Sequence, residues 1–275
     1  MKRALVISSD DLGMTLSINR GIEMAYRQKA LTSANFMVPG PWFEHAAKAL
    51  RHAEIDLGVH LTLTCDWDPY KWRPLSHGRS LLDKTGYLYS SIQELMENAT
   101  AEDIRAECRL QIATALSRGL PIVYADLHMC IPTIEKDLLS REMRVLNPDY
   151  DLALMRIVDG VAQEFGLPYP YALHEERLIY FKSALSISGK SRPAVESYLT
   201  ALEAGVHHLS CHCSIATEEQ NNLAESESDR HPWAATYRVT DLERITAVWF
   251  KELLQAHQIE LVRMPFSEPM IAARG

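Results

Sequence analysis

Residues 3–13 read RALVISSDDLG, and this stretch decides the fold class. Its apolar residues 4–7 predict a strand that is buried on both faces, as the strands of a parallel sheet are. Two carboxylates, Asp10 and Asp11, follow at once, and Gly13 permits a sharp turn after them. Because α/β proteins place their sites at the carboxyl ends of their strands, the same stretch also marks a candidate site.

The remaining sequence alternates between strand-like and helix-like patterns. Strands are expected over residues 33–38, 55–64, 122–129, 173–181, 206–213 and 259–263. Helices are expected to begin near Thr15 or Ser17, Pro41 and Thr100, and to cover residues 135–146, 151–165, 193–204 and 241–257. This alternation, without an internal repeat or a low-complexity linker, predicts an α/β fold in a single domain over residues 1–275.

The composition excludes several classes of protein. A hydrophobic fraction of 47% with 23% charged residues is ordinary for a globular protein. The net charge of −8 opposes binding to phosphate backbones, so we expect no nucleic-acid partner. We expect no membrane partner, since no apolar run reaches the roughly 18 residues that span a bilayer. The sequence shows no signal peptide, and its five cysteines lack the spacing of a disulfide framework, so a cytoplasmic location is expected.

A long irregular segment, about residues 65–89, interrupts the alternation. It is rich in proline, glycine and aromatic residues, and loops of this length on α/β scaffolds usually lie over the site. Trp67, Trp72 and Arg73 are therefore candidates for binding a substrate, because indole faces stack on the apolar faces of sugar rings. The alternative is that the two tryptophans pack the loop against the core.

The adjacent carboxylates Asp10 and Asp11 need a cation or a proton near them, because like charges so close repel each other. A metal ion held by one carboxylate, with the other free as a base, resolves this conflict. The dipeptide alone does not say which carboxylate takes which role. The alternative is a pair that caps the next helix through the dipole at its N-terminus.

Polar side chains recur on one face of the strand expected at residues 55–64. Side chains alternate faces along a strand, so His60, Thr62 and Thr64 share one face and apolar residues share the other. Unsatisfied buried polar groups cost roughly 1–3 kcal/mol each, so this polar face needs a purpose. His60 is either a metal ligand or a core histidine that is bonded to a backbone carbonyl.

Asp126 and His128 show the same pattern near the end of the strand expected at residues 122–129. A carboxylate near a ligand histidine orients its ring, so Asp126 is a candidate for that supporting role. Asp11, His60 and His128 then lie at three strand ends. One carboxylate with two imidazoles leaves positions for water and substrate, which suits a catalytic Zn²⁺ or Mn²⁺. Mg²⁺ usually prefers more oxygen ligands, and the ligand types do not settle the metal.

His212 lies late in the strand expected at residues 206–213. The pKa of a histidine ordinarily lies near neutrality, so His212 is the natural proton donor to a leaving amine. Cys211 and Cys213 flank it, but the alternation of the strand points both thiols away from its ring. The sequence has no second cysteine pair to complete a zinc site, and we expect no cysteine ligand.

Together these segments resemble the YdjC-like carbohydrate deacetylases. The resemblance covers nearly the whole chain and rests on an ordered set of motifs. The motifs are SDDLG at residues 9–13, NRGI at 19–22, TSA at 32–34, MV at 37–38, LGVHLTLT at 57–64, WRPL at 72–75, ADLHM at 125–129, GV at 205–206, SCH at 210–212 and EL at 260–261.

This resemblance implies a (β/α) barrel-like fold related to the polysaccharide deacetylases. It implies a metal-dependent hydrolase that removes acetyl groups from N-acetylated sugars, with an acetylated sugar as its partner. One divalent ion, Mg²⁺ or Zn²⁺, would be held by Asp11, His60 and His128. Asp10 would be the base and His212 the partner acid.

The chain departs from the family at Cys213, where many members carry proline, and at Met129-Cys130, beside the metal ligands. The second departure lies where it would alter the choice of substrate, and neither departure removes a proposed metal ligand.

Two other functions stay open. A metal-dependent phosphoesterase on the same scaffold would need cations at the site, and only Arg20 and Arg73 are obvious candidates. A non-enzymatic sugar-binding protein would keep the fold without the reaction, and a homodimer is also left open.

Overall fold

The computed structural model describes residues 2–65, 67, 70–129, 134–136, 143–145, 151–171, 173–174, 177–178, 180–223 and 234–266. Within these residues one nine-stranded sheet runs in the order β4-β3-β2-β1-β10-β9-β5-β6, and β11 pairs with β1 outside this path. Its strands are β1 (Arg3–Leu12), β2 (Ser33–Phe36), β3 (Asp56–Leu61), β4 (Ile122–Leu127), β5 (Ile134–Lys136), β6 (Met143–Val145), β9 (Ala184–Ser186), β10 (Gly205–Cys211) and β11 (Ile259–Leu261). A separate hairpin is formed by β7 (Leu173–His174) and β8 (Arg177–Leu178).

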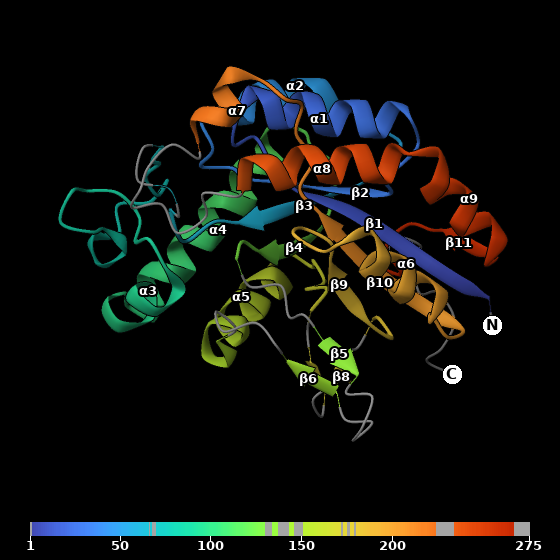
Figure 1. The fold of residues 1–275 in the computed structure, drawn as a ribbon. Coiled ribbons are helices and arrows are strands. Elements are labelled where there is room, and N and C mark those ends of the chain that lie inside the picture. Colours follow the sequence, from blue (N-terminus) through green and yellow to red (C-terminus); the bar gives the residue numbers. More distant parts are fainter. Residues whose placement is uncertain are drawn as a thin grey trace.

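Helices connect the strands and cover the sheet (Figure 1). They are α1 (Leu16–Arg27), α2 (Phe43–Leu50), α3 (Ile92–Asn98), α4 (Ala101–Ser117), α5 (Leu152–Glu164), α6 (Arg192–Thr200), α7 (Glu218–Asn222), α8 (Ala234–Thr246) and α9 (Val248–Ala256), with a short 3₁₀ helix η1 at Arg79–Leu81. Figure 1 shows α1, α2 and α8 along one side of β1, and α1 contacts both α2 and α8. The helices α4 and α5 pack on each other and against β4.

Most of the strand pairing is parallel. β1 pairs in parallel with β2, β10 and β11, and parallel pairing continues from β2 through β3 to β4 and from β10 to β9. Among the described strands of this sheet, antiparallel pairing is confined to β5, with β6 and β9. A parallel sheet with crossover helices is the predicted α/β class, which is confirmed. Within the described residues, no ladder joins β4 to β6.

The sequence explains why β1 lies at the centre of the sheet. Residues 5–7 have no exposed surface, and burying each of these side chains contributes roughly 1.5–3 kcal/mol. The following helix, α1, begins at Thr15, whose side chain accepts a hydrogen bond from the backbone N–H of Ile18. Ile18 and Ile22 lie one turn apart and are fully buried, so they dock α1 on the sheet.

Three expected elements differ from the structure. Residues 134–136 and 143–145 are strands rather than parts of a helix, and the rest of that expected helix lies outside the described residues. The expected strand at 173–181 contains the hairpin of β7 and β8 instead. Segments as short as these carry too little hydrophobic periodicity to distinguish a helix from a strand. The helix expected at 241–257 is two helices, because Ala247 between them has an extended backbone.

The parallel strands bring the candidate residues to one end of the sheet. Asp10 and Asp11 are the last polar residues of β1, and His60 lies one residue before the end of β3. His128 directly follows β4, and His212 directly follows β10. Because these strands run in one direction, their carboxyl ends meet at the same edge.

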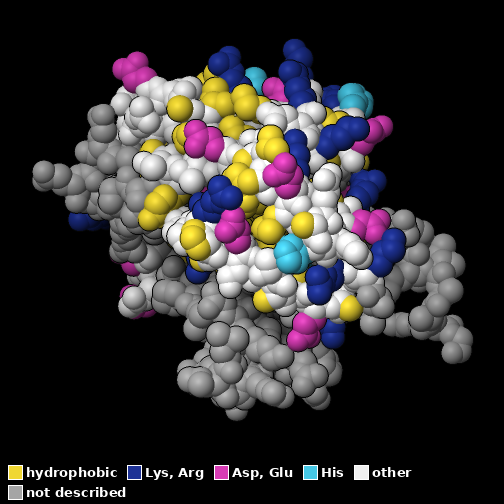
Figure 2. All heavy atoms as spheres, turned by 45° about the vertical axis from the view of Figure 1, so that its right-hand side comes forward, with side chains coloured by type: hydrophobic (Ala, Val, Ile, Leu, Met, Phe, Trp, Pro, Cys, Tyr) yellow, Lys and Arg dark blue, Asp and Glu magenta, His cyan; other side chains and the backbone are white. Residues whose placement is uncertain are grey.

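No helix in the described part of the chain combines the length and the apolar character needed to cross a membrane. On the face drawn in Figure 2, Lys and Arg side chains are interspersed with Asp and Glu side chains. Neither sign of charge forms a continuous patch on this face.

Candidate metal centre and active site

The backbone at the end of β1 places two carboxylates in the site. Asp10 and Asp11 are both fully buried. The pairing of β1 with β2 shifts register between Ser9 and Leu12, and Asp11 has a φ of 66°. An irregularity of this kind re-aims a side chain that a regular strand would point elsewhere. The left-handed backbone at Asp11 costs of order 1–3 kcal/mol, which is typical of a functional position.

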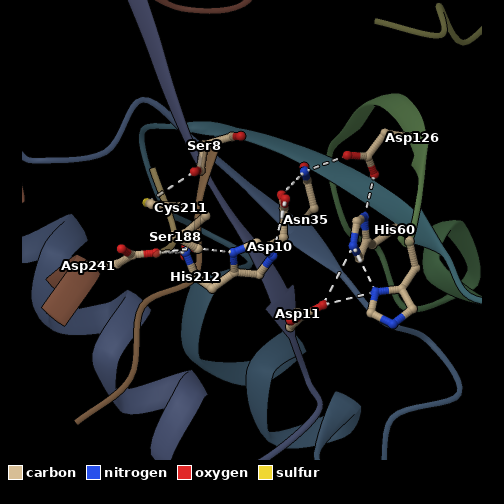
Figure 3. Close-up of polar contacts among 12 residues, drawn as sticks. Ser8, Asp10, Asp11, Asn35, His60, Asp126, Ser188, Cys211, His212 and Asp241 are labelled. Atoms are coloured by element: carbon tan, nitrogen blue, oxygen red, sulfur yellow. Dashed lines mark hydrogen bonds and ion pairs between the residues drawn. The ribbon is translucent and has the colours of Figure 1, made fainter. Parts of the chain in front are cut away.

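Three donor atoms from three strand ends converge (Figure 3). Asp11 Oδ1 lies 3.5 Å from Nε2 of His60 and 3.2 Å from Nδ1 of His128, and these two nitrogens are 3.2 Å apart. Ligands roughly 2.1 Å from one ion lie about 3.0 Å apart at a right angle and about 3.4 Å apart at the tetrahedral angle. The triangle of donor atoms therefore fits one divalent metal ion and leaves positions for water and substrate.

Asp126 fixes the ring of His60. The two residues are direct partners in the pairing of β3 with β4, and Asp126 Oδ1 lies 2.8 Å from Nδ1 of His60. This contact makes Nδ1 the hydrogen-bond donor and leaves the lone pair of Nε2 for a metal. The sequence suggests a ring-orienting role for Asp126 from its place near His128, and the contact that the structure shows is with His60.

Asn35, which the sequence analysis misses, links two aspartates. Its Nδ2 donates to Asp10 Oδ1 at 2.6 Å and to Asp126 Oδ2 at 2.8 Å, while its Oδ1 accepts a hydrogen bond from Tyr124. Both carboxylates are buried, and this one amide holds them in place. The signal in the sequence is the alternation of Ser33 and Asn35 on one face of an otherwise apolar strand.

A second missed residue, Arg238 on α8, pairs with Asp11. Its Nη1 lies 2.6 Å from Asp11 Oδ2, and the arginine is 5% exposed. Burial raises the pKa of Asp11, but the charge of Arg238 and a hydrogen bond from His128 outweigh burial and hold that pKa well below its ordinary value. Asp11 is therefore ionised at neutral pH, with Oδ2 on the arginine and Oδ1 directed at the two imidazoles.

Asp10 has the opposite electrostatic environment. Burial raises its pKa to about 7; a nearby histidine opposes this rise, whereas the carboxylates of Asp126 and Asp11 add to it. Its Oδ2 has no hydrogen-bond partner within the described residues and lies 3.9 Å from Nε2 of His212. A buried carboxylate with one free oxygen and a pKa near neutrality is suited to proton transfer.

His212 approaches the site from β10. In the view of Figure 3, Asp10 and Asp11 lie between His212 and His60. Nδ1 of His212 lies 2.8 Å from Oγ of Ser188, which the sequence analysis also misses. Burial lowers the pKa of His212 to about 3, so its ring is neutral before any reaction begins.

The cysteines near His212 are not among the donor groups. The Sγ atoms of Cys211 and Cys213 lie 3.7 Å apart, and Cys211 Sγ lies 3.2 Å from the carbonyl oxygen of Ser8. Both thiols thus share one face, as the alternation of the strand predicts. Cys108, Cys211 and Cys213 are free, buried thiols. Cys130, one of the departures from the family, lies outside the described residues.

The two tryptophans of the aromatic-rich segment are buried. Trp67 and Trp72 are each 3% exposed, and Nε1 of Trp72 donates to the carbonyl of Thr64 at 2.9 Å. The ring of Trp72 meets that of His128 edge-on, with centroids 6.4 Å apart. The guanidinium of Arg238 lies 5.4 Å from the centroid of Trp67. These contacts favour the packing alternative, in which the indoles support residues of the site.

Arg73 lies on the exposed side of the same segment. Its guanidinium is 5.0 Å from the centroid of Tyr87, and no contact described in the structure joins it to the aspartates and histidines of the site.

The aromatic-rich segment is anchored by Glu107 on α4, a fully buried carboxylate. It accepts hydrogen bonds from the backbone N–H groups of Leu75 at 3.0 Å and Ser76 at 2.7 Å.

Comparison with known proteins gives a consistent assignment. The family model described as YdjC-like protein matches residues 4–256. A relative from Thermus thermophilus, named carbohydrate deacetylase, is 30% identical over 82% of this chain and 82% of its own. A relative from Brevibacillus brevis with the same name is 27% identical over 96% of this chain and 98% of its own.

A solved structure from Enterococcus faecalis shares the fold. It has a TM-score of 0.74 and 20% identity over 96% of this chain and 98% of its own, and that protein carries the name cellobiose-phosphate cleavage protein. At this identity the likeness concerns the fold alone. The family match runs from β1 to the end of α9 and includes every residue of the candidate site, so the protein belongs to the YdjC-like family.

Proposed function

We propose that this protein is a metal-dependent hydrolase that removes the acetyl group from an N-acetylated sugar or oligosaccharide. One observation carries the proposal: the donor triangle of Asp11, His60 and His128 lies beside two groups suited to proton transfer, Asp10 and His212. Hydrolysis of an amide by water needs an electrophile and acid–base groups, and this set supplies both. The relatives named carbohydrate deacetylases support a sugar as the substrate.

Asp11, His60 and His128 would hold one divalent ion, which would polarise the acetamide carbonyl and lower the pKa of a water molecule. Two imidazoles with one carboxylate favour Zn²⁺ or a similar transition-metal ion. Mg²⁺, which prefers oxygen ligands, is the alternative. Nη1 of Arg238 pairs with Oδ2 of Asp11, and Oδ1 is the oxygen that faces the two imidazoles.

The remaining groups supply the proton transfers. Asp10 Oδ2, without a hydrogen-bond partner among the described residues, takes a proton from water as the water oxygen bonds to the carbonyl carbon. Nε2 of His212, 3.9 Å from that oxygen, delivers a proton to the amine nitrogen as the C–N bond breaks. Acetate and the free amino sugar then leave. Because His212 is neutral at rest, it takes up the proton during the reaction, and its positive charge needs local support.

The two rival functions fit the site less well. A phosphoesterase needs cations free to meet phosphate, but Arg20 and Arg73 are exposed and Arg238 is committed to Asp11. A protein that only binds sugar has no use for an ionised carboxylate and two imidazoles held at coordinating distances.

Acetate release tests the proposal. The protein would be incubated with N-acetylglucosamine and its β-1,4-linked oligosaccharides, with Zn²⁺ or Mg²⁺ and then with EDTA. We expect acetate release that the chelator abolishes and that returned metal restores. Binding of the oligosaccharide without acetate release, in the presence of metal, would favour the sugar-binding alternative. Phosphate release from sugar phosphates without acetate release would favour the phosphoesterase, and either result contradicts the proposal.

We further propose a cytoplasmic location. Cys108, Cys211 and Cys213 are free thiols, which is consistent with a reducing compartment. Cell fractionation of the producing organism tests this location, and recovery of the protein in the culture medium would contradict it.

A further inference from the structure

α8 carries three charged residues spaced three apart: Arg238, Asp241 and Arg244. Residues at this spacing lie near one face of a helix. Arg238 reaches the carboxylate of the metal-site candidate, as described above. At the other end, Arg244 donates to the carbonyl groups of Ile187 at 3.0 Å and Lys190 at 2.8 Å. These two hydrogen bonds hold residues 187–190 against α8.

Between the two arginines, Asp241 begins a hydrogen-bonded chain that ends at His212 (Figure 3). Ser188 Oγ donates to Asp241 Oδ2 and lies 2.8 Å from Nδ1 of His212. The backbone N–H of His212 also donates to Asp241 Oδ2, at 3.0 Å. Asp241 is fully buried, whereas the side chain of His212 is 23% exposed and its Nε2 faces Asp10. The chain thus joins a buried carboxylate to the imidazole at the site.

The number of hydrogens fixes the direction of each bond. Burial raises the pKa of Asp241 to about 6, so at and above neutral pH the carboxylate is ionised and accepts the single hydroxyl hydrogen of Ser188. The hydroxyl then has no hydrogen left for His212, and the 2.8 Å contact requires Nδ1–H to donate to Oγ. The neutral ring therefore carries its proton on Nδ1 and presents the lone pair of Nε2 to the site.

We propose that Ser188 and Asp241 are positioning residues, which hold His212 in the tautomer whose Nε2 receives and delivers the reaction proton. This inference rests on the proposed role of His212. No proton passes through Ser188: the proton arrives at Nε2 and leaves from Nε2 to the amine nitrogen as the C–N bond breaks. Nδ1–H stays bonded to Ser188 throughout, so the imidazolium forms without a new hydrogen bond, with an anion at the far end of the chain.

Charged and titratable groups surround His212 on both sides. The groups whose charges act on its imidazole are Asp11, Arg238, His60 and His128, and Asp10 lies within 3.9 Å of Nε2. On the Nδ1 side, the structure places Asp241, reached through Ser188, with Arg244 Nη1 3.6 Å from its Oδ1. Asp241 is thus the acid whose negative charge is directed at Nδ1.

The first test reads the tautomer directly. Long-range ¹H–¹⁵N spectra of the Zn²⁺-loaded protein, labelled with ¹⁵N-histidine, would be recorded at neutral pH. The signals of His212 are those that disappear in the His212→Gln variant. We expect a ring protonated on Nδ1 with an unprotonated Nε2. A neutral ring protonated on Nε2 would overturn the proposal, whatever the activity.

The second test separates positioning from folding by kinetics. Ser188→Ala leaves Nδ1–H of the imidazolium without its acceptor, so kcat for acetate release should fall about 10- to 100-fold with KM unchanged. Ser188→Thr keeps the hydroxyl and should recover most of kcat. The matched control is Ser186→Ala, a half-buried serine two residues earlier, which should behave as wild type.

Asp241 is tested in the same way. Asp241→Asn keeps the size of the side chain and removes its charge, so kcat should fall while KM stays unchanged. Glu243→Gln, on the exposed side of α8, should have no effect. If both Ser188→Ala and Asp241→Asn retain full kcat while His212→Gln is inactive, the positioning role is wrong and the acid role stands. If His212→Gln is itself fully active, the acid role in the proposed function is wrong.

Discussion

Asp126 Oδ1 lies 2.8 Å from Nδ1 of His60, and the two residues are direct partners in the pairing of β3 with β4. The contact directs Nε2 of His60 to the side where Asp11 lies. The strand register therefore sets both the tautomer and the direction of one imidazole of the candidate metal site. A shift of the register by one residue would turn Asp126 to the other face of the sheet and leave Nδ1 of His60 without this acceptor.

Asp126→Ala should weaken metal binding by about 10- to 100-fold, the usual effect of removing a group that orients a ligand. His60→Ala should weaken it further, because only two of three donors remain. Both are measured by titration with Zn²⁺ and by elemental analysis of the purified variants. The control is His77→Ala, which changes an exposed histidine and should keep full metal content. Full metal content in His60→Ala would exclude His60 as a ligand.

Asp10→Asn should spare the metal and reduce kcat for acetate release by about 10²–10⁴-fold, the range for general acid–base groups. Asparagine has the same size, and its Oδ1 can still accept the hydrogen bond from Asn35. Metal content and kcat would be measured on the same sample. Activity that survives this change would show that Asp10 is not the base, and loss of metal would show that it is a ligand.

The central part of the fold follows from local patterns. The apolar run of residues 4–7 and the capping of α1 by Thr15 involve neighbours in the sequence, so both were predictable. The segments at 134–136 and 143–145 were assigned wrongly, because short strands owe their form to pairing with distant segments, here β9 and each other.

A residue of the candidate site was predictable only where it lies at the end of a strand that its own segment of sequence predicts. Asp11, His60 and His128 met that condition. Asn35 followed the same alternation and was overlooked. Arg238 was not predictable, since its contact with Asp11 depends on how α8 packs on α1 and β10, and no local pattern in the sequence contains that arrangement.

Gly58→Ala should destabilise the protein by about 1–3 kcal/mol. A Cβ at this position in β3 would overlap the ring of Tyr124 and lie 2.7 Å from Oδ1 of Asn35. Because Asn35 holds Asp10, kcat should fall as well. Gly160→Ala in α5 is the matched control, since a Cβ there meets nothing within 4 Å. It should stabilise the protein by roughly 0.5–1 kcal/mol, as alanine does in a helix. Urea unfolding measures both, and a fully stable Gly58→Ala variant would contradict the close packing.

His208 should make the protein less stable in acid. It is 1% exposed in β10, where Nε2 lies 2.8 Å from Oγ of Ser8 and Nδ1 lies 3.0 Å from the hydroxyl of Tyr171. Burial lowers its pKa to about 3, whereas the ordinary pKa of histidine is about 6.5. Between these values the unfolded chain binds a proton at this residue and the folded protein does not. The contribution of His208 to stability is therefore fully present above about pH 6.5 and is lost as the pH falls toward 3.

The free energy of unfolding, measured in urea at several pH values between about 4.5 and 7, isolates this contribution. Other groups titrate in the same range, so the informative quantity is the difference in slope between wild type and His208→Gln. The variant cannot take up the proton, and its free energy of unfolding should fall with decreasing pH less steeply, by a difference that reaches roughly 1.4 kcal/mol for each pH unit well below pH 6.5. His52→Gln, which changes an exposed histidine, is the matched control and should keep the wild-type slope. Equal slopes in wild type and His208→Gln would mean that the buried ring is protonated as readily in the folded protein as in the unfolded chain.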